Sequence, residues 1–308
     1  MDFKHLRYFL TISEEGSFSK AAQKLRVAQP ALSLHVKNME ADLGVKLLHR
    51  RSRGTQPTEA GALLAEKARL LLSDLSRAKE DVRTLGREPS GTVRFGMPGT
   101  LSEVLAAPLI TRCQARFPKI KIVIADAMSG FVETWLREGQ VDVALLFTVP
   151  RSTDLTVTEL LEEELVLLIG QQTPFGSCSI QEILETAPLI APSGQHGLRL
   201  KLEQVFEQHK LVLNPVIEVD SYATIKTLVR EGYGVSVLPR RAVSQSDDRR
   251  TLITRSFPDG SLYRTAYLAY PARRQLTQAC QLVTQELRNT ASALLAANEW
   301  PGARPVVS

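Results

Sequence analysis

The sequence predicts a chain of three parts: a small basic helical module, one long helix, and a larger body of alternating strands and helices. Its 308 residues exceed what a single compact core usually holds. The first 58 residues contain ten Lys and Arg against five Asp and Glu, whereas the remainder contains 28 of each, so the whole net charge of +5 lies in the module. A seven-residue apolar repeat follows the module, and strand-like runs alternate with helix-like runs after it.

Composition excludes several classes of protein. Hydrophobic residues make up 44% of the chain and charged residues 23%, as in folded globular proteins. No apolar run is long enough to cross a membrane, and the N-terminus lacks the pattern of a secretory signal. The cysteines are odd in number and lack metal-ligand spacing, which predicts a protein of the reducing cytoplasm. They are Cys113, Cys178 and Cys280. No metal site and no cofactor are expected.

The basic module is expected to hold three helices. Gly16 ends the first amphipathic helix, and Ser17 can cap the second. Pro30 suits the first turn of the third, because its fixed φ is helical and its missing N–H would be unpaired there. Four residues at i, i+4, i+7 and i+11 are predicted to face the core: Leu32, Val36, Met39 and Leu43. A different face carries Gln29, Ser33 and Lys37, with no acid before Glu40.

The break before Pro30 indicates how the module could work. A new helix set at an angle to its predecessor has a protruding N-terminal turn, and helix-turn-helix proteins place such a turn in a DNA major groove. An ordinary helical hairpin with a solvated face is the alternative for this stretch alone. The run "LLHRRSRGTQPT", residues 47–58, favours DNA, because a basic hairpin beside such a helix can place arginines at phosphates or in the minor groove.

This N-terminal segment resembles the winged helix-turn-helix of LysR-type transcriptional regulators, and the length of the chain fits that family throughout. The match is carried by Phe9, Gly16, Ser17, Ala21, Ala22, Leu25, Gln29, Pro30, Ala31, Ser33, Glu40, Leu43, Gly44, Leu47, Arg50, Pro57, Thr58 and Gly61. One departure is Ala28, where many members have serine, and this removes the best N-cap of the third helix. The runs "VAQPALS", "RSRGTQPTEAG" and "GVSVLP" also resemble the nitrogen assimilation control branch of the family.

The resemblance implies a sequence-specific regulator of transcription that binds double-stranded promoter DNA through residues 1–58. The predicted DNA-binding residues are Ser17, Gln29, Pro30, Ala31, Ser33, Lys37, Arg50, Arg51, Arg53 and Thr58. RNA polymerase is a further expected partner, and no membrane contact is expected.

The segment 59–87 is predicted to be a dimerising linker helix that Thr58 caps. Apolar residues recur there with alternating spacings of four and three, which is the seam of a two-helix coiled coil. They are Leu64, Ala68, Leu71, Leu75, Ala78, Val82 and Leu85. Two copies would present two recognition helices to a pseudo-palindromic site, and dimers of dimers, hence a homotetramer, are usual in the family. The alternative is a helix that packs on its own domain.

The body, residues 91–308, follows an α/β plan in which ligands bind at the carboxyl ends of strands. The expected strands are Val93–Gly96, Ile120–Ala125, Val141–Phe147, Leu165–Gly170, Leu189–Ala191, Ile217–Val219 and Val235–Leu238, and expected helices include Leu101–Arg116 and Arg199–His209. By resemblance this is the LysR effector-binding domain, which is similar to periplasmic binding proteins. Its small-molecule effector would lie between subdomain I, about 91–162 and 266–296, and subdomain II, about 163–265.

Loops after these strands carry small polar residues at helix starts, which suits an anion or a polar metabolite. Such residues are often only helix caps, so each has a purely structural alternative. The predicted effector-binding residues are Thr100, Ser102, Ser129, Phe147, Ser193, His196 and Asp220, and Thr100 and Ser129 align with inducer-binding positions of the family. The first three loops hold no arginine, so a small amphiphile is favoured over a multiply charged acid, although Arg199 could reach in.

Other functions fit the sequence less well. An enzyme is not expected, and no catalytic residue is predicted, because no nucleotide fingerprint, metal cluster or nucleophile motif is present. An exported solute-binding protein would leave the basic module and the coiled coil without a use. A thiol redox sensor would need a partner for Cys178. A regulator of the same family that acts without an inducer is the closest alternative.

Overall fold

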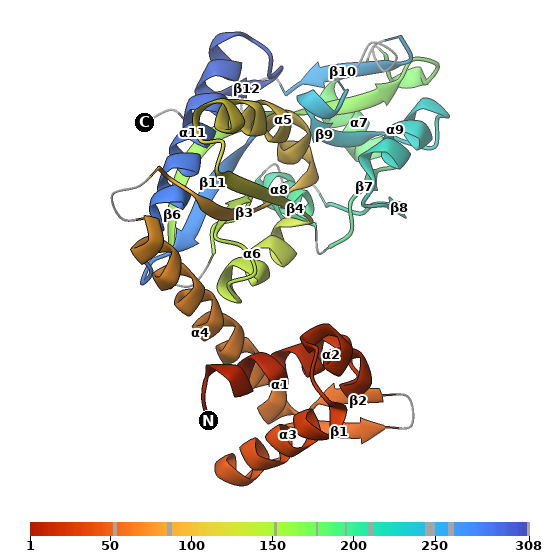
Figure 1. The fold of residues 1–308 in the computed structure, drawn as a ribbon. Coiled ribbons are helices and arrows are strands. Elements are labelled where there is room, and N and C mark those ends of the chain that lie inside the picture. The colour runs from red at the N-terminus through yellow and green to blue at the C-terminus, as the bar shows by residue number, and fades with distance from the viewer. Residues whose placement is uncertain are drawn as a thin grey trace. The chain divides into compact units, whose positions relative to one another are not determined.

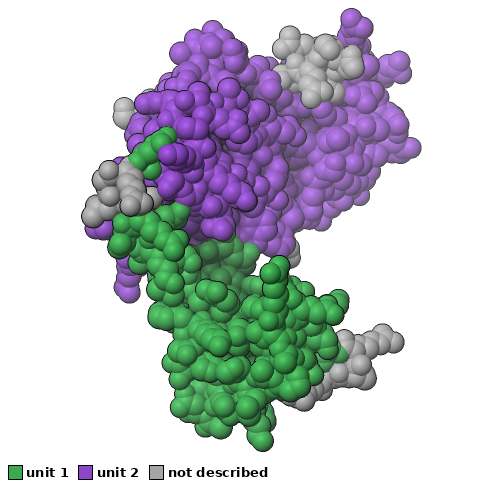
Figure 2. Space-filling view, in the orientation of Figure 1, with its two compact units in different colours: residues 1–88, 137–140 green, residues 89–136, 141–308 purple. Residues whose placement is uncertain are grey.

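The computed structural model divides into two compact units, residues 1–88 with 137–140 and residues 89–136 with 141–308 (Figure 2). None of the helices in the described ranges combines the length and hydropathy that a bilayer span requires. The described residues are 1–51, 54–84, 88–150, 153–176, 178–194, 196–208, 212–243, 250–257 and 262–306.

The basic module contains three helices and a two-stranded hairpin (Figure 1). Gly16 ends the first helix with a φ of 61°, and Ser17 Oγ caps the second by accepting from Lys20 N at 3.4 Å, as predicted. The third helix has no side-chain N-cap at Ala28, also as predicted. The elements are α1 (Phe3–Glu15), α2 (Phe18–Leu25), α3 (Gln29–Leu43), β1 (Leu48–Arg51) and β2 (Gly54–Pro57).

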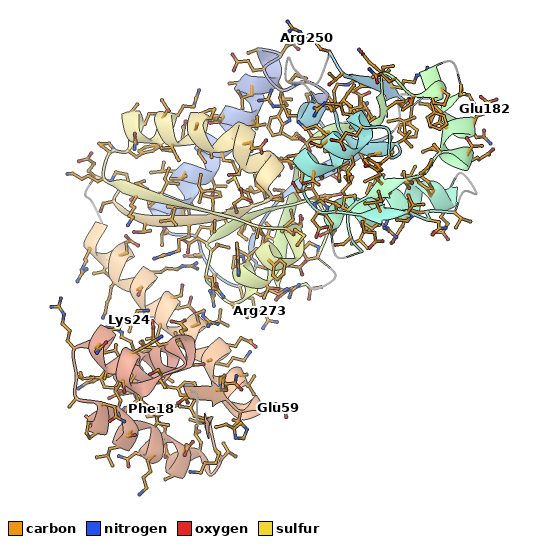
Figure 3. The ribbon with its side chains drawn as sticks, turned by 90° about the vertical axis from the view of Figure 1, so that its right-hand side faces the viewer. Phe18, Lys24, Glu59, Glu182, Arg250 and Arg273 are labelled. Atoms are coloured by element: carbon orange, nitrogen blue, oxygen red, sulfur yellow. The ribbon has the colours of Figure 1, made fainter. Side chains whose placement is uncertain are left out.

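The module's core confirms most of the predicted inner face of α3. Leu32, Val36 and Met39 are buried beside Phe9 and Ile12 of α1. Phe18 of α2, labelled in Figure 3, belongs to the same core. The prediction for Leu43 was wrong, because its side chain is 41% exposed. The core ends at Met39 along this helix, so the last turn lies outside it.

The linker helix α4 (Glu59–Thr84) begins where Thr58 caps it, with Gly61 N donating to Thr58 Oγ1 at 3.0 Å. Its first half packs on the module, and Ala68 is completely buried in the module's core. The predicted seam must therefore be corrected at its first two positions, because Ala68 is not available to a second chain and Leu64 is partly buried against the same core. In this half of the helix the alternative holds, since the helix packs on its own domain. Farther along the helix, Leu71 is 49% exposed and Val82 is 76% exposed. Leu85 lies outside the described residues.

The body is built on an eight-stranded sheet with the order β10-β6-β11-β5-β3-β4, in which β12 and β9 also pair with β6. The parallel strands are β3 (Gly91–Met97), β4 (Ile120–Asp126) and β5 (Val143–Leu146), whereas β11 (Tyr263–Pro271) runs antiparallel to β5 and to the long β6 (Leu155–Gly170). α5 (Gly99–Arg116) and α11 (Gln278–Ala296) share the first core with these strands, and α6 (Ser129–Arg137) belongs to a smaller cluster with β5.

A second core lies around the other half of β6. On β6, Leu161 belongs to the first core and Leu165 to the second. Near β11 the order is reversed, since Leu262, just before the strand, belongs to the second core and Ala266, within the strand, to the first. The chain therefore crosses between cores twice. The remaining elements are η1 (Pro174–Gly176), α7 (Ile180–Thr186), β7 (Ile190–Ala191), α8 (Gly197–Gln208), β8 (Ile217–Glu218), α9 (Tyr222–Arg230), β9 (Ser236–Pro239), η2 (Arg240–Val243), β10 (Leu252–Ser256) and β12 (Ala303–Arg304).

All seven predicted strands correspond to observed strands, although β6 begins ten residues earlier than expected. Strands β10, β11 and β12 were not predicted from the sequence. The two predicted helices correspond to α5 and α8, and each begins two residues before the predicted start. His209, the predicted end of the second, lies outside the described residues.

Candidate functional site

A cavity of about 360 Å³ lies in the body where four helices begin. The first turns of α5 and α6 contribute Thr100 and Ser129, and those of α8 and α9 contribute Gly197 and Tyr222. The first two helices follow strands of the first core, whereas the other two pack on the second core. The cavity is therefore a cleft between elements of the two cores, at the strand ends where α/β proteins bind ligands.

Five of the seven predicted effector residues line this cleft: Thr100, Ser129, Phe147, His196 and Asp220. Ser102 does not, because it lies two positions after Thr100 on α5 and so points about 200° away around the helix. Ser193 does not line it either, and instead its backbone N–H donates to Asp220 Oδ1 at 2.9 Å. Ser193 therefore positions Asp220 rather than facing the cavity.

The main residue that sequence reasoning missed is Arg264, at the start of β11. Its side chain is 2% exposed and lines the cleft. Nη2 and Nε donate to Glu163 Oε2 at 2.7 and 3.0 Å, and Trp300 Nε1 donates to Glu163 Oε1 at 3.0 Å. The guanidinium carbon lies 3.5 Å from the centre of the Phe147 ring. The arginine of the cleft therefore comes from β11 and not from the predicted candidate, Arg199.

Arg199 instead joins α8 to β8. Its Nη1 donates to Glu218 Oε1 of β8 and its Nε to Glu203 Oε1 within α8, both at 2.9 Å. Arg199 does not line the cleft.

Four polar groups of the cleft have an acceptor site occupied by a protein donor. Arg264 donates to Thr100 Oγ1 at 3.2 Å and to Tyr222 Oη at 3.4 Å. Phe147 N donates to Ser129 Oγ at 3.3 Å. Leu198 N donates to His196 Nδ1 at 3.1 Å, so the neutral imidazole carries its hydrogen on Nε2. The hydroxyl hydrogens of Thr100, Ser129 and Tyr222 and the Nε2 hydrogen of His196 are therefore available to another acceptor.

Burial sets the protonation of several groups in the cleft. Desolvation, reinforced by the charge of Arg264, lowers the pKa of His196, which keeps the imidazole neutral. Burial also raises the pKa of the Tyr222 hydroxyl, so it stays protonated and able to donate. At Asp220 a hydrogen bond has the largest effect: the Ser193 N–H donates to the carboxylate and lowers its pKa.

Three carboxylates also line the cleft, from Glu103, Asp126 and Asp220. Burial raises the pKa of Asp126. Asp126 follows β4 and lies against the first turn of α5, since a Cβ added at Gly99 would be 3.2 Å from Asp126 Oδ1. Within the described residues, neither Asp126 nor Glu103 has a side-chain hydrogen-bond or ion-pair partner.

The second candidate site is the outer face of α3. Gln29, Pro30, Ala31 and Lys37 are exposed there, and Ser33 is half-buried. Arg53 lies outside the described residues, as do the side chains of Arg50 and Arg51.

Two other predicted DNA-binding residues already have structural partners. Thr58 Oγ1 donates to Lys46 O at 2.7 Å and caps α4, while Ser17 caps α2.

Glu40 lies at the end of the outer face of α3 and connects this helix to the hairpin. Its carboxylate accepts from Lys46 Nζ at 2.7 Å and from Leu47 N at 2.9 Å. Although burial opposes the change, these donors hold the pKa of Glu40 below its usual value. The acid at this position therefore positions the hairpin rather than repelling a ligand of the face.

Two family models match the two parts of the chain that hold these candidate sites. Residues 3–62 match the model of bacterial regulatory helix-turn-helix proteins of the lysR family, and residues 86–292 match the LysR substrate binding domain. The nitrogen assimilation regulatory protein Nac of Escherichia coli is 30% identical over 302 residues, covering 97% of this chain and 99% of Nac.

Solved structures share the fold. Full-length OxyR from Pseudomonas aeruginosa is 23% identical and superposes with a TM-score of 0.73, over 94% of each chain. Full-length CbnR in complex with its target DNA is 21% identical, with a TM-score of 0.68 over 94% of this chain and all of CbnR.

Proposed function

The chain belongs to the LysR family of transcriptional regulators, which join a DNA-binding helix-turn-helix to an effector-binding domain, and from this premise we propose how its residues perform both tasks. Its relatives are regulators rather than enzymes, and we propose the same of this chain, acting on promoter DNA in the cytoplasm. The similarity to Nac supports a place near the nitrogen assimilation control branch.

The outer face of α3 is proposed to read the DNA. The observation that carries this is an exposed N-terminal turn with Gln29, Pro30 and Ala31 at the start of a helix whose opposite face is buried. The polar side chains of Gln29 and Ser33 suit base edges, and the positive end of the helix dipole at such a turn suits phosphates. Lys37, two turns later, is placed to contact the backbone, and the arginines of the hairpin are proposed to add flanking contacts.

The exposed part of α4 is proposed to pair with a second copy. Leu71 and Val82 lie in the described part of the seven-residue repeat and are open to solvent in the single chain. Pairing two such helices buries the apolar seam and brings two copies of α3 to one site. We also propose that the dimers associate into a homotetramer and that the protein contacts RNA polymerase. Both proposals rest only on what is usual in the family.

The cleft of the body is proposed to hold the effector. Thr100 and Ser129 belong to subdomain I, whereas His196 and Tyr222 belong to subdomain II, so a ligand that contacts all four would favour the closed arrangement. It can shift the regulator only by its difference in affinity for the two arrangements. A regulator without an inducer is the alternative, and a cleft that no metabolite enters would favour it.

DNA binding is tested with the full chain and DNA from upstream of its own gene and its neighbours, with random DNA as competitor. Ser33→Ala is expected to weaken specific binding more than non-specific binding, whereas Lys37→Ala weakens both and lowers the salt slope by about 1. Lys121→Ala, on an exposed position of β4, is the charge-matched control and should bind normally. Unchanged binding of both α3 variants would contradict the assignment.

A further inference from the structure

We propose that the effector is a small zwitterion of the amino acid type, with its carboxylate on the donors of the cleft and its ammonium group on Asp126 and Glu103. This inference rests on the proposed function, because it names the chemistry of the ligand for the same cleft. It is carried by the contacts of the cleft side chains and by the balance of charge around them.

The donor side of the cleft requires an acceptor on the ligand. Thr100, Ser129 and Tyr222 each accept a hydrogen bond from the protein, so each hydroxyl hydrogen is left for another acceptor. His196 presents Nε2–H for the same reason. Donors that stay unpaired once water is excluded are costly, so a bound ligand should supply acceptor oxygens. A carboxylate offers about four lone-pair sites in one compact group.

The charge balance disfavours a ligand that carries only negative charge. The guanidinium of Arg264 is the charged donor of the cleft, but its charge is matched by Glu163, which accepts two of its hydrogen bonds. Glu103, Asp126 and Asp220 then leave the cavity wall with an excess of negative charge. A second anionic group on the ligand would meet this wall and be repelled.

Asp126 and Glu103 are instead available to a cation. Both are exposed at the cavity wall, and neither has a side-chain partner within the described residues, so a positive group of the ligand can reach them. An ammonium group provides three donors and a full charge. The expectation of a small amphiphile is thereby refined to a ligand with both signs of charge.

The spacing of the two recognition elements fits a ligand whose charges are close together. Asp126 lies against Gly99, and Thr100 is the next residue of the same helical turn. The ammonium and carboxylate groups of an α-amino acid are separated by one carbon atom, so one molecule can reach both elements. The cavity of about 360 Å³ is at the small end of ligand pockets, which suits a ligand of this size.

The experiment measures binding of three matched sets of compounds to the full chain, by thermal shift and then calorimetry. The first set is the protein L-amino acids, the second is the corresponding 2-oxo and 2-hydroxy acids, and the third is the corresponding amino acid amides. The first set is expected to contain the binders. Loss of either charged group should weaken binding by about ten- to a hundredfold.

Variants separate the two ends of the ligand. Asp126→Asn should weaken the amino acid by at least about tenfold while leaving the matching hydroxy acid unchanged or bound more tightly. Thr100→Val should weaken both compounds. Glu159→Gln makes a comparable change of charge at an exposed position of β6 outside the cleft and should leave binding unchanged.

Three results would overturn the inference: no binder in the first set, tighter binding of the hydroxy or oxo acids, or normal amino acid binding by Asp126→Asn. The proposed function has a separate readout. A compound of any class whose binding is weakened by Thr100→Val and Ser129→Ala would keep the effector cleft and reject only its amino acid chemistry. A binder that ignores both variants would reject the cleft itself.

Discussion

Replacing Arg264 by methionine is predicted to destabilise the body far more than breaking a neighbouring ion pair. Arg264 and Glu163 are 2% and 3% exposed, so Arg264→Met leaves a buried carboxylate without its counter-charge. Removing one partner of such a buried pair typically costs about 3–5 kcal/mol. With a urea dependence of about 1–3 kcal/mol per molar, the unfolding midpoint should fall by at least about 1 M.

Trp300 makes this change measurable in the full chain. It is buried and donates to Glu163, so its fluorescence reports the region around the pair. The chain has two tryptophans, and Trp135→Phe leaves Trp300 as the only one. Urea unfolding followed by this signal then reports the body without contribution from the basic module, which contains no tryptophan.

Two further variants decide whether the cause is the buried charge. Arg304→Met breaks the pair with Glu162, the preceding residue of β6, but these side chains are 41% and 19% exposed. Its expected cost is about 0–1 kcal/mol. Adding Glu163→Gln to Arg264→Met removes the stranded charge while keeping an acceptor for Trp300, and should recover about 2 kcal/mol. An Arg264→Met protein as stable as the Arg304→Met protein, or no recovery in the double variant, would refute the reasoning.

Three other predictions concern assembly, thiol chemistry and pH. Leu71→Asp with Leu75→Asp places like charges on the predicted seam, so sedimentation should show smaller species and operator affinity should be lost; an unaltered assembly size would place the interface elsewhere. Burial raises the pKa of Cys113 to about 11, so alkylation at pH 8 followed by mass spectrometry should label half-buried Cys178 first, and equally fast labelling of Cys113 would contradict this. Burial lowers the pKa of His196 below the value of about 6.5 expected in the unfolded chain. The stabilisation from the neutral imidazole is therefore complete above about pH 6.5 and is lost as the pH falls below that value. His196→Gln should flatten this pH dependence of the unfolding free energy, and an unchanged pH profile would contradict the prediction.

Sequence patterns predicted the parts of the fold that depend on local chemistry. Gly16 and Ser17 mark a helix end and a helix start by conformation and capping, and both act within a few residues of the chain. The buried strands of the body are continuous apolar runs, which any fold must cover. Leu43 and Ala68 were misjudged because periodicity gives a face of a helix but not the length over which a neighbour covers it.

Arg264 could not be found in this way. It lies in an alternating strand, and a charge there is usually taken to face solvent. Its environment depends on Glu163, its partner in register across the β6–β11 ladder but 101 residues away in the chain. The run Glu162–Glu164 has the same ambiguity, because three consecutive acids resemble a solvated segment. In the fold each accepts from a different arginine: Arg304, Arg264 and Arg240.

The position of Arg264 also explains how one ligand could act on both subdomains. The arginine is anchored on Glu163, at the crossing between the two cores, and donates to Thr100 of subdomain I and Tyr222 of subdomain II. Since both hydroxyls then point their hydrogens elsewhere, an acceptor that satisfies the two together must touch both halves. Such a ligand binds the closed body better than the open one, and this difference is the free energy available to change DNA binding, typically about 1–3 kcal/mol. A ligand held by one half alone would bind both arrangements equally and could not regulate.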